Sequence, residues 1–560
     1  MSRTMFALLM ILGVNVAQAV DYEVLIRNGT VHDGTGAPAY VADLAIKGDR
    51  IVAIGNFSES AADLEIDASG LVVAPGFFNM MSHAHLSLLK DGRAKSDILQ
   101  GVTIEILSEI SLSPVNESTA EFWASLFVEE DVELSWSQLG EYLEVVEVSG
   151  VAPNFGTFVS AATVRMNVLG MDDVDPTPEQ LEEMKAQVDQ AMLEGAFGLT
   201  NALIYAPGTY AETEELIELA KVAGRHGGIY TAHIRSEGNQ FIEAIDETLR
   251  IGREGNLPVK IHHLKAGGQP NWHKMDIAIE KIEALRKEGI PVTADMYTYV
   301  AGATGLDASM PTWVQAGGYD KWAERLKDPE IRARVKAEMA TNAQDWENLG
   351  YFAGPKGMMF IGFKNDDLKK YMGKTLAEVA AERGQDPLDT MIDLVIEDGS
   401  RVGTVYFLMS EENLRKQIRQ PWVMFGSDAH APAAEGKELE DAVHPRTYGN
   451  VARLLGKYVR DEQVIPMEEA IRRLTLLPAQ TLSVSERGRL APGFFADITI
   501  FDPANIRDHA TFEDPHHYST GINHVLVNGV PVVTDGEHTG ATPGRAVRGP
   551  GWVQQKEKQQ

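Results

Sequence analysis

Short runs of apolar and β-branched residues alternate with helical stretches through the middle of this chain. Residues 229–232, 259–261 and 423–425 have the composition of short strands. Residues 213–226 and 241–254 lie between such runs and carry apolar positions at helical spacing. Alternation of strand and helix predicts a parallel sheet covered by helices, and in a closed (β/α) barrel the chemistry gathers at the carboxyl ends of the strands.

Histidine or aspartate stands at the end of each apolar run. His83 and His85 follow the run at 73–81. Positions i and i+2 of a strand point to the same side, so these two imidazoles can converge on one ion. His233, His263 and Asp428 end the other three runs. A catalytic zinc usually takes three protein ligands and keeps one position open for water, so several strand ends are predicted to contribute to one metal site.

Several short motifs carry a resemblance to a known family. They are Ala-Pro-Gly-Phe at 74–77, Gln-Gly-Val-Thr at 100–103, Gly-Ala-Phe-Gly-Leu at 195–199, Ala-His-Ile-Arg at 232–235, His-His-Leu-Lys at 262–265, Gly-Ser-Asp at 426–428 and His-Pro-Arg-Thr-Tyr-Gly at 444–449. In this order and spacing they resemble the amidohydrolase superfamily and, within it, the N-acyl-D-amino-acid deacylases, or D-aminoacylases. The resemblance extends over nearly the whole chain after residue 20.

The two ends of the chain differ in character from its middle. Strand-like runs at 22–27, 42–47, 51–55, 496–501 and 525–529 favour one discontinuous β domain built from residues 20–75 and 476–553. The resemblance implies an α/β fold in which this domain is a β-sandwich beside a (β/α)8 TIM-like barrel, which we place at residues 76–475. An irregular stretch at about 300–405 contains a charged amphipathic helix at 321–340. We expect a lid-like insertion there, with an ordinary surface excursion as the alternative.

The first residues have the layout of a secretory signal peptide. Arg3 precedes the apolar stretch 5–14, and Ala17-Gln18-Ala19 offers a small-x-small cleavage site. A membrane anchor is the alternative, but the apolar stretch is about half of the roughly 20 residues that span a bilayer. We therefore expect residues 1–19 to be removed after Ala19 and the protein to be secreted, to a bacterial periplasm, without stable membrane insertion. Residues 554–560 are predicted to form a disordered tail.

The composition disfavours several kinds of site and partner. The chain has no cysteine, so it can form neither disulfides nor thiolate metal ligands. Its 81 acidic residues exceed its 50 lysines and arginines, and the net charge of −31 disfavours nucleic acid and anionic membrane surfaces as partners. We expect a small-molecule substrate and leave the oligomeric state open.

The resemblance implies Zn2+ as cofactor, as one or two ions. The expected ligands are His83, His85, Glu109, His233, His263 and Asp428. The family carries a metal ligand shortly after its Gln-Gly-Val-Thr motif; Glu109 matches that position, and Glu105 is the alternative. The resemblance fits one tightly bound zinc at His233, His263 and Glu109 with a weaker second ion at His83 and His85. It fits two fully occupied zinc sites equally well.

Asp428 is the candidate catalytic residue. A bound zinc lowers the pKa of water and polarises a carbonyl, and a carboxylate beside that water can take up its proton and pass it to the leaving amine. The commoner role of an isolated aspartate at a strand end is a turn or a helix N-cap.

Lys265, Tyr297 and Arg446 match the family positions that bind the substrate carboxylate. Arginine suits a bidentate grip on such a group, although taken singly the two cations would be salt-bridging residues and the tyrosine a core residue. Met310 and Trp313 of the insertion would suit an apolar acyl chain. His262 is expected to be structural, and His226 and His430 are assigned no functional role.

These expectations describe a zinc-dependent enzyme that hydrolyses the amide bond of N-acyl-amino acids to a carboxylate and a free amino acid. The D configuration rests on the resemblance alone. One alternative is another amidohydrolase reaction, on a cyclic amide, a dipeptide or a carbamate, because one fold hosts many reactions. The other is a non-catalytic metal-binding relative, which would lack a ligand or the base.

Overall fold

The computed structural model describes residues 21–552 apart from 118, 121 and 124–131. The predicted signal peptide at 1–19 and the predicted tail at 554–560 lie outside the described residues. In the part of the chain that is described, no helix combines the length and the apolar character needed to cross a membrane.

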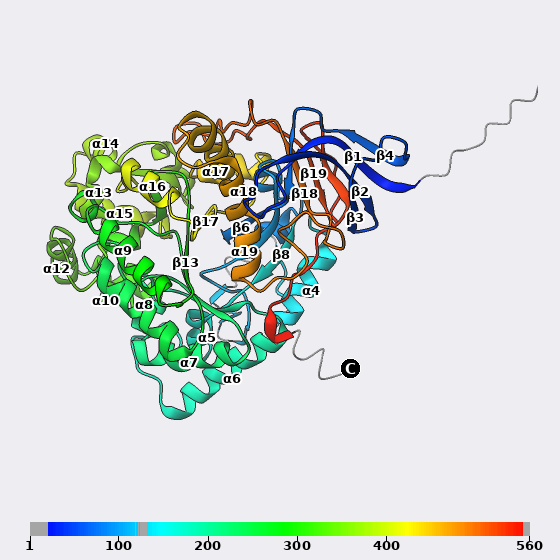
Figure 1. Cartoon of the computed structure of the whole chain (residues 1–560). Helices are drawn as coiled ribbons and strands as arrows, with labels where there is room; N and C mark the ends of the chain where they lie inside the picture. Colours follow the sequence, from blue (N-terminus) through cyan, green and yellow to red (C-terminus); the bar gives the residue numbers. More distant parts are fainter. Residues whose placement is uncertain (1–20, 118, 121, 124–131, 553–560) are drawn as a thin grey trace, which may run out of the picture.

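Strands from both ends of the chain form one nine-stranded sheet (Figure 1). Its members are β1 (Tyr22–Val31), β2 (Tyr40–Lys47), β3 (Arg50–Gly55), β4 (Ala62–Asp67), β5 (Val72–Pro75), β18 (Ile498–Phe501), β19 (Ile522–Val527), β20 (Val530–Thr534) and β21 (Glu537–His538). The two ends meet where β5 pairs with β18 in antiparallel orientation, with Val73 opposite Ile500. Both side chains are fully buried in an aliphatic core. Their burial fastens the two ends of the chain to each other.

Parallel strands of the middle region form the barrel. They are β6 (Phe77–Ser82), β7 (Val102–Leu107), β8 (Asn154–Thr157), β9 (Val159–Ser160), β10 (Gly198–Ala202), β11 (Ile229–His233), β12 (Val259–Ile261), β13 (Val292–Met296) and β17 (Val423–Phe425). Backbone hydrogen bonds from Asp428 to Met81 (2.9 Å) and from His83 to Ala429 (3.0 Å) connect the ends of β17 and β6. With β8 and the adjoining β9 counted as one strand, the described residues form a ring of eight strands. The predicted α/β barrel is confirmed.

Helices cover the outside of this ring (Figure 1). They include α5 (Ala161–Leu169), α6 (Pro178–Glu194), α7 (Thr213–Arg225), α8 (Phe241–Gly255), α9 (Lys274–Lys287), α16 (Glu411–Ile418), α17 (Arg446–Arg453) and α18 (Met467–Leu474). In α7, Leu216, Leu219 and Ala223 are buried, whereas Glu214 and Lys221 are exposed. This spacing of three to four residues turns one apolar face toward the barrel.

Residues 302–406 form the insertion between β13 and β17. Its elements are the antiparallel strands β14 (Gly302–Gly305), β15 (Met358–Gly362) and β16 (Gly403–Tyr406) and the helices α10 (Thr312–Gln315), α11 (Tyr319–Lys327), α12 (Pro329–Met339), α13 (Leu349–Ala353), α14 (Leu376–Arg383) and α15 (Pro387–Asp398). Apolar side chains of these elements pack into a hydrophobic core of their own.

The single helix predicted at 321–340 is wrong, because α11 ends before Asp328 and α12 begins after it. Pro329 has no N–H group to continue a helix. The Asp328 carboxylate instead accepts hydrogen bonds from the backbone N–H groups of Glu330 and Ile331 at 2.9 and 3.1 Å, which caps the new helix.

Candidate active site

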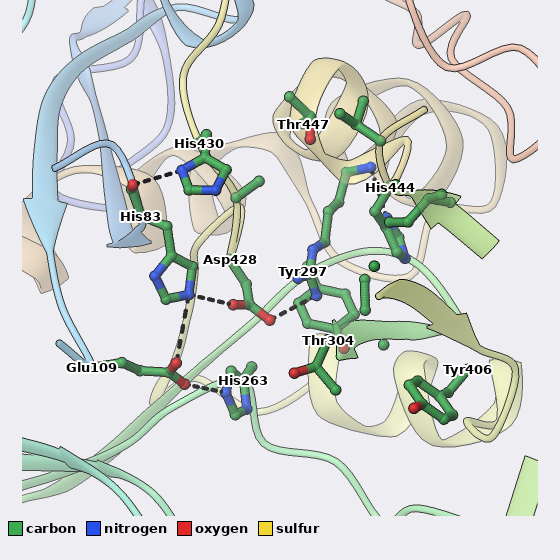
Figure 2. Close-up of a pocket in the computed structure, with 18 of the residues that line it drawn as sticks. His83, Glu109, His263, Tyr297, Thr304, Tyr406, Asp428, His430, His444 and Thr447 are labelled. Atoms are coloured by element: carbon green, nitrogen blue, oxygen red, sulfur yellow. Dashed lines mark hydrogen bonds and ion pairs between the residues drawn. The ribbon is translucent and has the colours of Figure 1, made fainter. Parts of the chain in front are cut away.

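Five of the predicted site residues meet at the carboxyl ends of the barrel strands. Figure 2 shows four of them, His83, Glu109, His263 and Asp428. His83 follows β6, Glu109 follows β7, His233 ends β11, His263 follows β12 and Asp428 follows β17. Glu109, His263 and Asp428 have positive φ angles of 66°, 29° and 51°. Such angles are uncommon for residues with side chains and cluster at functional sites. The backbone turns sharply at these three positions, just beyond the strands.

The Glu109 carboxylate lies between two pairs of side chains. Its Oε1 atom is 2.7 Å from His263 Nε2 and 3.2 Å from His233 Nδ1. Its Oε2 atom is 3.5 Å from His83 Nε2, and that nitrogen is 3.1 Å from Asp428 Oδ1. Two donor groups result, Glu109–His233–His263 and His83–Glu109–Asp428, and in each the ligand atoms lie within 4.8 Å of one another. The two groups share Glu109.

The donor atoms of both groups fit a metal ion. Imidazole nitrogens and carboxylate oxygens are ligands that suit zinc. His233 Nε2 is buried and has no hydrogen-bond partner among the described residues, so this nitrogen is not committed to the protein's own hydrogen bonds. A carboxylate shared by the two groups could contact one ion with each oxygen.

The buried carboxylates of the site are held in the ionised form. Burial alone would raise the pKa of Glu109, but hydrogen bonds from His233 and His263 outweigh it and keep this pKa well below its usual range. Burial also opposes ionisation of Asp428, yet the charges of Arg446 and then His263 lower the pKa of Asp428. Ionised carboxylates are the form that binds a metal or accepts a proton.

His85 lies outside both donor groups. His83 and His85 do not share one face of a strand as predicted, because β6 ends at Ser82 and both histidines follow it. The His85 ring is buried, its nitrogens have no hydrogen-bond partner in the described part of the chain, and burial lowers its pKa to about 3. It is therefore a neutral imidazole, and its role as a ligand stays a prediction.

Glu105 lies deeper in the barrel than Glu109. It is fully buried, and its Oε2 atom accepts a hydrogen bond of 2.9 Å from Asn79 Nδ2. Burial raises the pKa of Glu105 to about 7. Because the candidate ligand groups contain Glu109 and not Glu105, the geometry favours Glu109.

His262 is fully buried beneath the site. Its Nε2 atom is 2.8 Å from Ser108 Oγ and 3.0 Å from Thr231 Oγ1. These contacts suit the structural role expected of it.

Glu237 is a site residue that was not predicted. Its Oε1 atom is 2.9 Å from His263 Nδ1 and 2.7 Å from Lys265 Nζ. Burial opposes its ionisation, but Lys265 and the histidines lower the pKa of Glu237 to about 2. A carboxylate in this position orients the histidine ring whose other nitrogen faces Glu109. The only signal in the sequence is an acidic residue four positions after His233.

Lys265, Tyr297 and Arg446, the predicted carboxylate-binding residues, lie together on one wall of the site. Arg446 Nη1 is 2.6 Å from Asp428 Oδ2, and the guanidinium carbon is 4.6 Å from the centre of the Tyr297 ring. Lys265 Nζ is 5.6 Å from the same ring centre. Two cations beside Asp428 make this wall suitable for a carboxylate.

A cavity of about 530 Å³ opens over these residues, and the insertion contributes Thr304 and Tyr406 to its wall (Figure 2). The insertion is therefore part of the substrate cavity. Met310 and Trp313 line neither this cavity nor a smaller one that adjoins it, so their expected contact with an acyl chain is wrong. Met310 is buried within the insertion, and Trp313 Nε1 donates a hydrogen bond of 2.9 Å to Glu338.

The two histidines without a predicted role differ in placement. His226 Nε2 is 2.8 Å from Asp189 Oδ1, away from the site. His430 lines the cavity, with its Nδ1 atom 2.8 Å from the backbone oxygen of His83 (Figure 2). His430 thus belongs to the site's surroundings, which its sequence context did not indicate.

Comparisons with known proteins agree with this geometry. Residues 64–533 match the amidohydrolase family. The chain is 33% identical to a D-aminoacylase of Alcaligenes xylosoxydans xylosoxydans over 94% of this chain and 97% of that protein. A solved D-aminoacylase structure matches with a TM-score of 0.78 and 31% identity, covering 94% of this chain and 100% of that one. That structure concerns the functional role of the binuclear metal centre of D-aminoacylase, with one-metal activation and second-metal attenuation.

A second solved structure has a TM-score of 0.77 and 28% identity and covers 94% of this chain and 99% of that one. It is the N-acyl-D-glutamate deacylase of Bordetella bronchiseptica, complexed with zinc and a phosphonate inhibitor that mimics the tetrahedral intermediate of the reaction. The match over most of the chain, together with the paired donor groups at the barrel mouth, shows that this protein belongs to the amidohydrolase family.

Proposed function

We propose that this enzyme is a zinc-dependent deacylase that hydrolyses the amide bond of N-acyl-D-amino acids to a carboxylate and a free D-amino acid. The observation that carries the proposal is Glu109 shared between two donor groups, directly beside a wall with Lys265, Tyr297 and Arg446. A hydrolytic centre next to cations suits an amide whose amine half bears a carboxylate. The related D-aminoacylase and N-acyl-D-glutamate deacylase support the D configuration.

Glu109, His233 and His263 would hold one ion, and His83, Glu109 and Asp428 a second. The zinc in the related N-acyl-D-glutamate deacylase structure and the binuclear centre of the related D-aminoacylase support one or two ions. Bound zinc would lower the pKa of water and polarise the amide carbonyl.

Asp428 would move the proton. Its ionised carboxylate takes a proton from the attacking water and delivers it to the leaving nitrogen, as the carbonyl carbon gains the water oxygen and loses its bond to nitrogen. Arg446 has five N–H donors, so it can keep its contact with Asp428 and still bind the substrate carboxylate. Lys265 has three N–H donors, so it can keep its contact with Glu237 and also bind the substrate carboxylate.

The proposal is tested by the release of free amine from paired N-acyl-D- and N-acyl-L-amino acids, with and without a chelator. We expect turnover of D substrates, its loss with the chelator and its return with added zinc. Cyclic amides, dipeptides and carbamates belong in the same panel. Turnover of one of these with none of the N-acyl-amino acids would contradict the proposal in favour of another amidohydrolase reaction.

We also propose export to the periplasm after cleavage behind Ala19. Support comes from the charged, apolar and small-residue order of residues 1–19. Mass spectrometry of the protein from a periplasmic fraction should give Val20 as the first residue. An intact N-terminus on protein found only in the cytoplasm would contradict export.

A further inference from the structure

A second cavity of about 310 Å³ adjoins the active-site cavity. Both are lined by Glu109, Ile110, Ala202, Tyr205 and Arg401, so they meet beside the shared carboxylate. The second cavity extends away from Asp428, Tyr297 and Arg446, none of which lines it. Its other walls include Met166 of α5, Met171, and Tyr319 and Trp322 of α11.

We propose that this second cavity binds the acyl group of the substrate, and that the preferred acyl group is uncharged, apolar and much larger than acetyl. The inference rests on the proposed deacylase function. In an N-acyl-amino acid the carbonyl carbon bears the acyl chain on one side and the nitrogen, with its carboxylate, on the other. The carboxylate wall at Arg446 and Tyr297 fixes the amine side, so the acyl chain extends past Glu109 to the opposite side.

The lining of the second cavity suits an uncharged chain. The charged groups on its described wall are the carboxylates of Glu109 and Asp307 and the guanidinium of Arg401, which is 2.8 Å from Asp307. Gln315 donates to the backbone oxygen of Asp307 at 3.0 Å, and Thr163 donates to that of Ser111 at 2.9 Å. A negatively charged acyl group would lose its hydration here and would face the carboxylates of Glu109 and Asp307.

The size of the cavity sets the scale of the acyl group. A cavity of about 150 Å³ holds one benzene molecule. The 310 Å³ here therefore suit a group of about twice that size, such as an aryl or a medium-length alkyl chain.

The test replaces Ala162, a half-buried residue of α5 that lines the second cavity and not the first. Ala162→Phe would place a phenyl ring in the second cavity and occupy about half of its volume. Ala303→Phe, which puts the same side chain into the active-site cavity, is the matched control. The substrates are the N-acetyl, N-octanoyl and N-succinyl derivatives of one D-amino acid, chosen as the one whose acetyl derivative the wild type hydrolyses fastest.

We expect the wild type to hydrolyse the octanoyl derivative with a kcat/KM at least about tenfold above that of the acetyl and succinyl derivatives, because additional methylenes are buried. Ala162→Phe should remove this preference and keep the acetyl rate, whereas Ala303→Phe should lower the rates of the acetyl and octanoyl derivatives together. Equal acetyl and octanoyl rates in the wild type, or an unchanged preference in Ala162→Phe, would overturn the inference alone. If Ala162→Phe has a lowered Tm, Ala162→Leu takes its place with the same expected loss of preference. A wild type that hydrolyses none of the derivatives would overturn the proposed function as well.

Discussion

Replacing Asp428 by asparagine keeps the size of the side chain and removes its charge. The carboxylate contacts His83 at 3.1 Å and Arg446 at 2.6 Å, and an amide in its place cannot take up a proton from water. Loss of a general base lowers turnover by about 10²–10⁴-fold, or roughly 3–5 kcal/mol of transition-state stabilisation. We therefore expect Asp428→Asn to lower kcat by this factor on the best N-acetyl-D-amino acid.

The same substitution releases Arg446 from its ion pair. Arg446 can then use all its donors on the substrate carboxylate, so KM should stay unchanged or fall while kcat drops. The group Glu109–His233–His263 does not contain Asp428, so at least one zinc per chain should remain.

Initial rates of amine release and the zinc content by elemental analysis test both expectations. Asp441→Asn is the matched control, because this aspartate lines the cavity and belongs to neither donor group. The control should keep a near-native kcat. A near-native kcat in Asp428→Asn would contradict the role of Asp428 as the base, and loss of all zinc would contradict a metal site that does not contain Asp428.

Three further substitutions test two contacts of the site and one buried carboxyl group. Glu237→Gln should weaken zinc binding by about 10–100-fold, because this carboxylate orients His263. Competition with a chelator measures the zinc affinity, and the exposed Glu214→Gln is the control. Equal zinc affinities of Glu237→Gln and the wild type would exclude the orienting role. Arg446→Lys should raise KM by about 10–100-fold through the loss of bidentate donors; an unchanged KM would remove Arg446 from substrate binding. Burial raises the pKa of Glu105 from 4.5 to about 7, and burial together with Glu105 raises the pKa of the neighbouring Asp97 well above its usual value, so the folded state keeps protons that the unfolded state releases. The free energy of unfolding should therefore fall as the pH rises through this range, and Glu105 should contribute up to about 3 kcal/mol of the fall. Glu105→Gln should flatten this fall in urea unfolding near pH 5 and pH 8, and an equal fall in both proteins would disprove the assignment.

Residues at strand ends were the predictable part of the site. His233, His263 and Asp428 each follow a short apolar run, and in a parallel barrel all such ends open on the same side. Glu109 could be located by its distance from the Gln-Gly-Val-Thr motif, although Glu105 competed with it. The candidate ligand groups, which contain Glu109 and not Glu105, favour Glu109, and no residue pattern in the sequence indicates the backbone turn at Glu109, with its φ of 66°.

Other features depend on contacts between distant segments. Glu237 follows His233 by four residues but matters because Lys265 and His263 come from the next strand end. The second cavity is bordered by both α5 and α11, which are about 150 residues apart in the sequence. Met310 was expected in the substrate pocket because it is apolar, yet the insertion has its own core, and Met310 packs there. Apolarity alone does not tell which of two neighbouring cores a side chain joins.

Anomalous diffraction of zinc in crystals of the zinc-loaded enzyme tests the role of Glu109 most directly. We predict an anomalous peak bounded by Glu109, His233 and His263, and at high zinc a second one between Glu109, His83 and Asp428. Zinc at another place in the barrel, with Glu109 contacting no ion, would contradict the central claim that this carboxylate joins the two metal-binding groups.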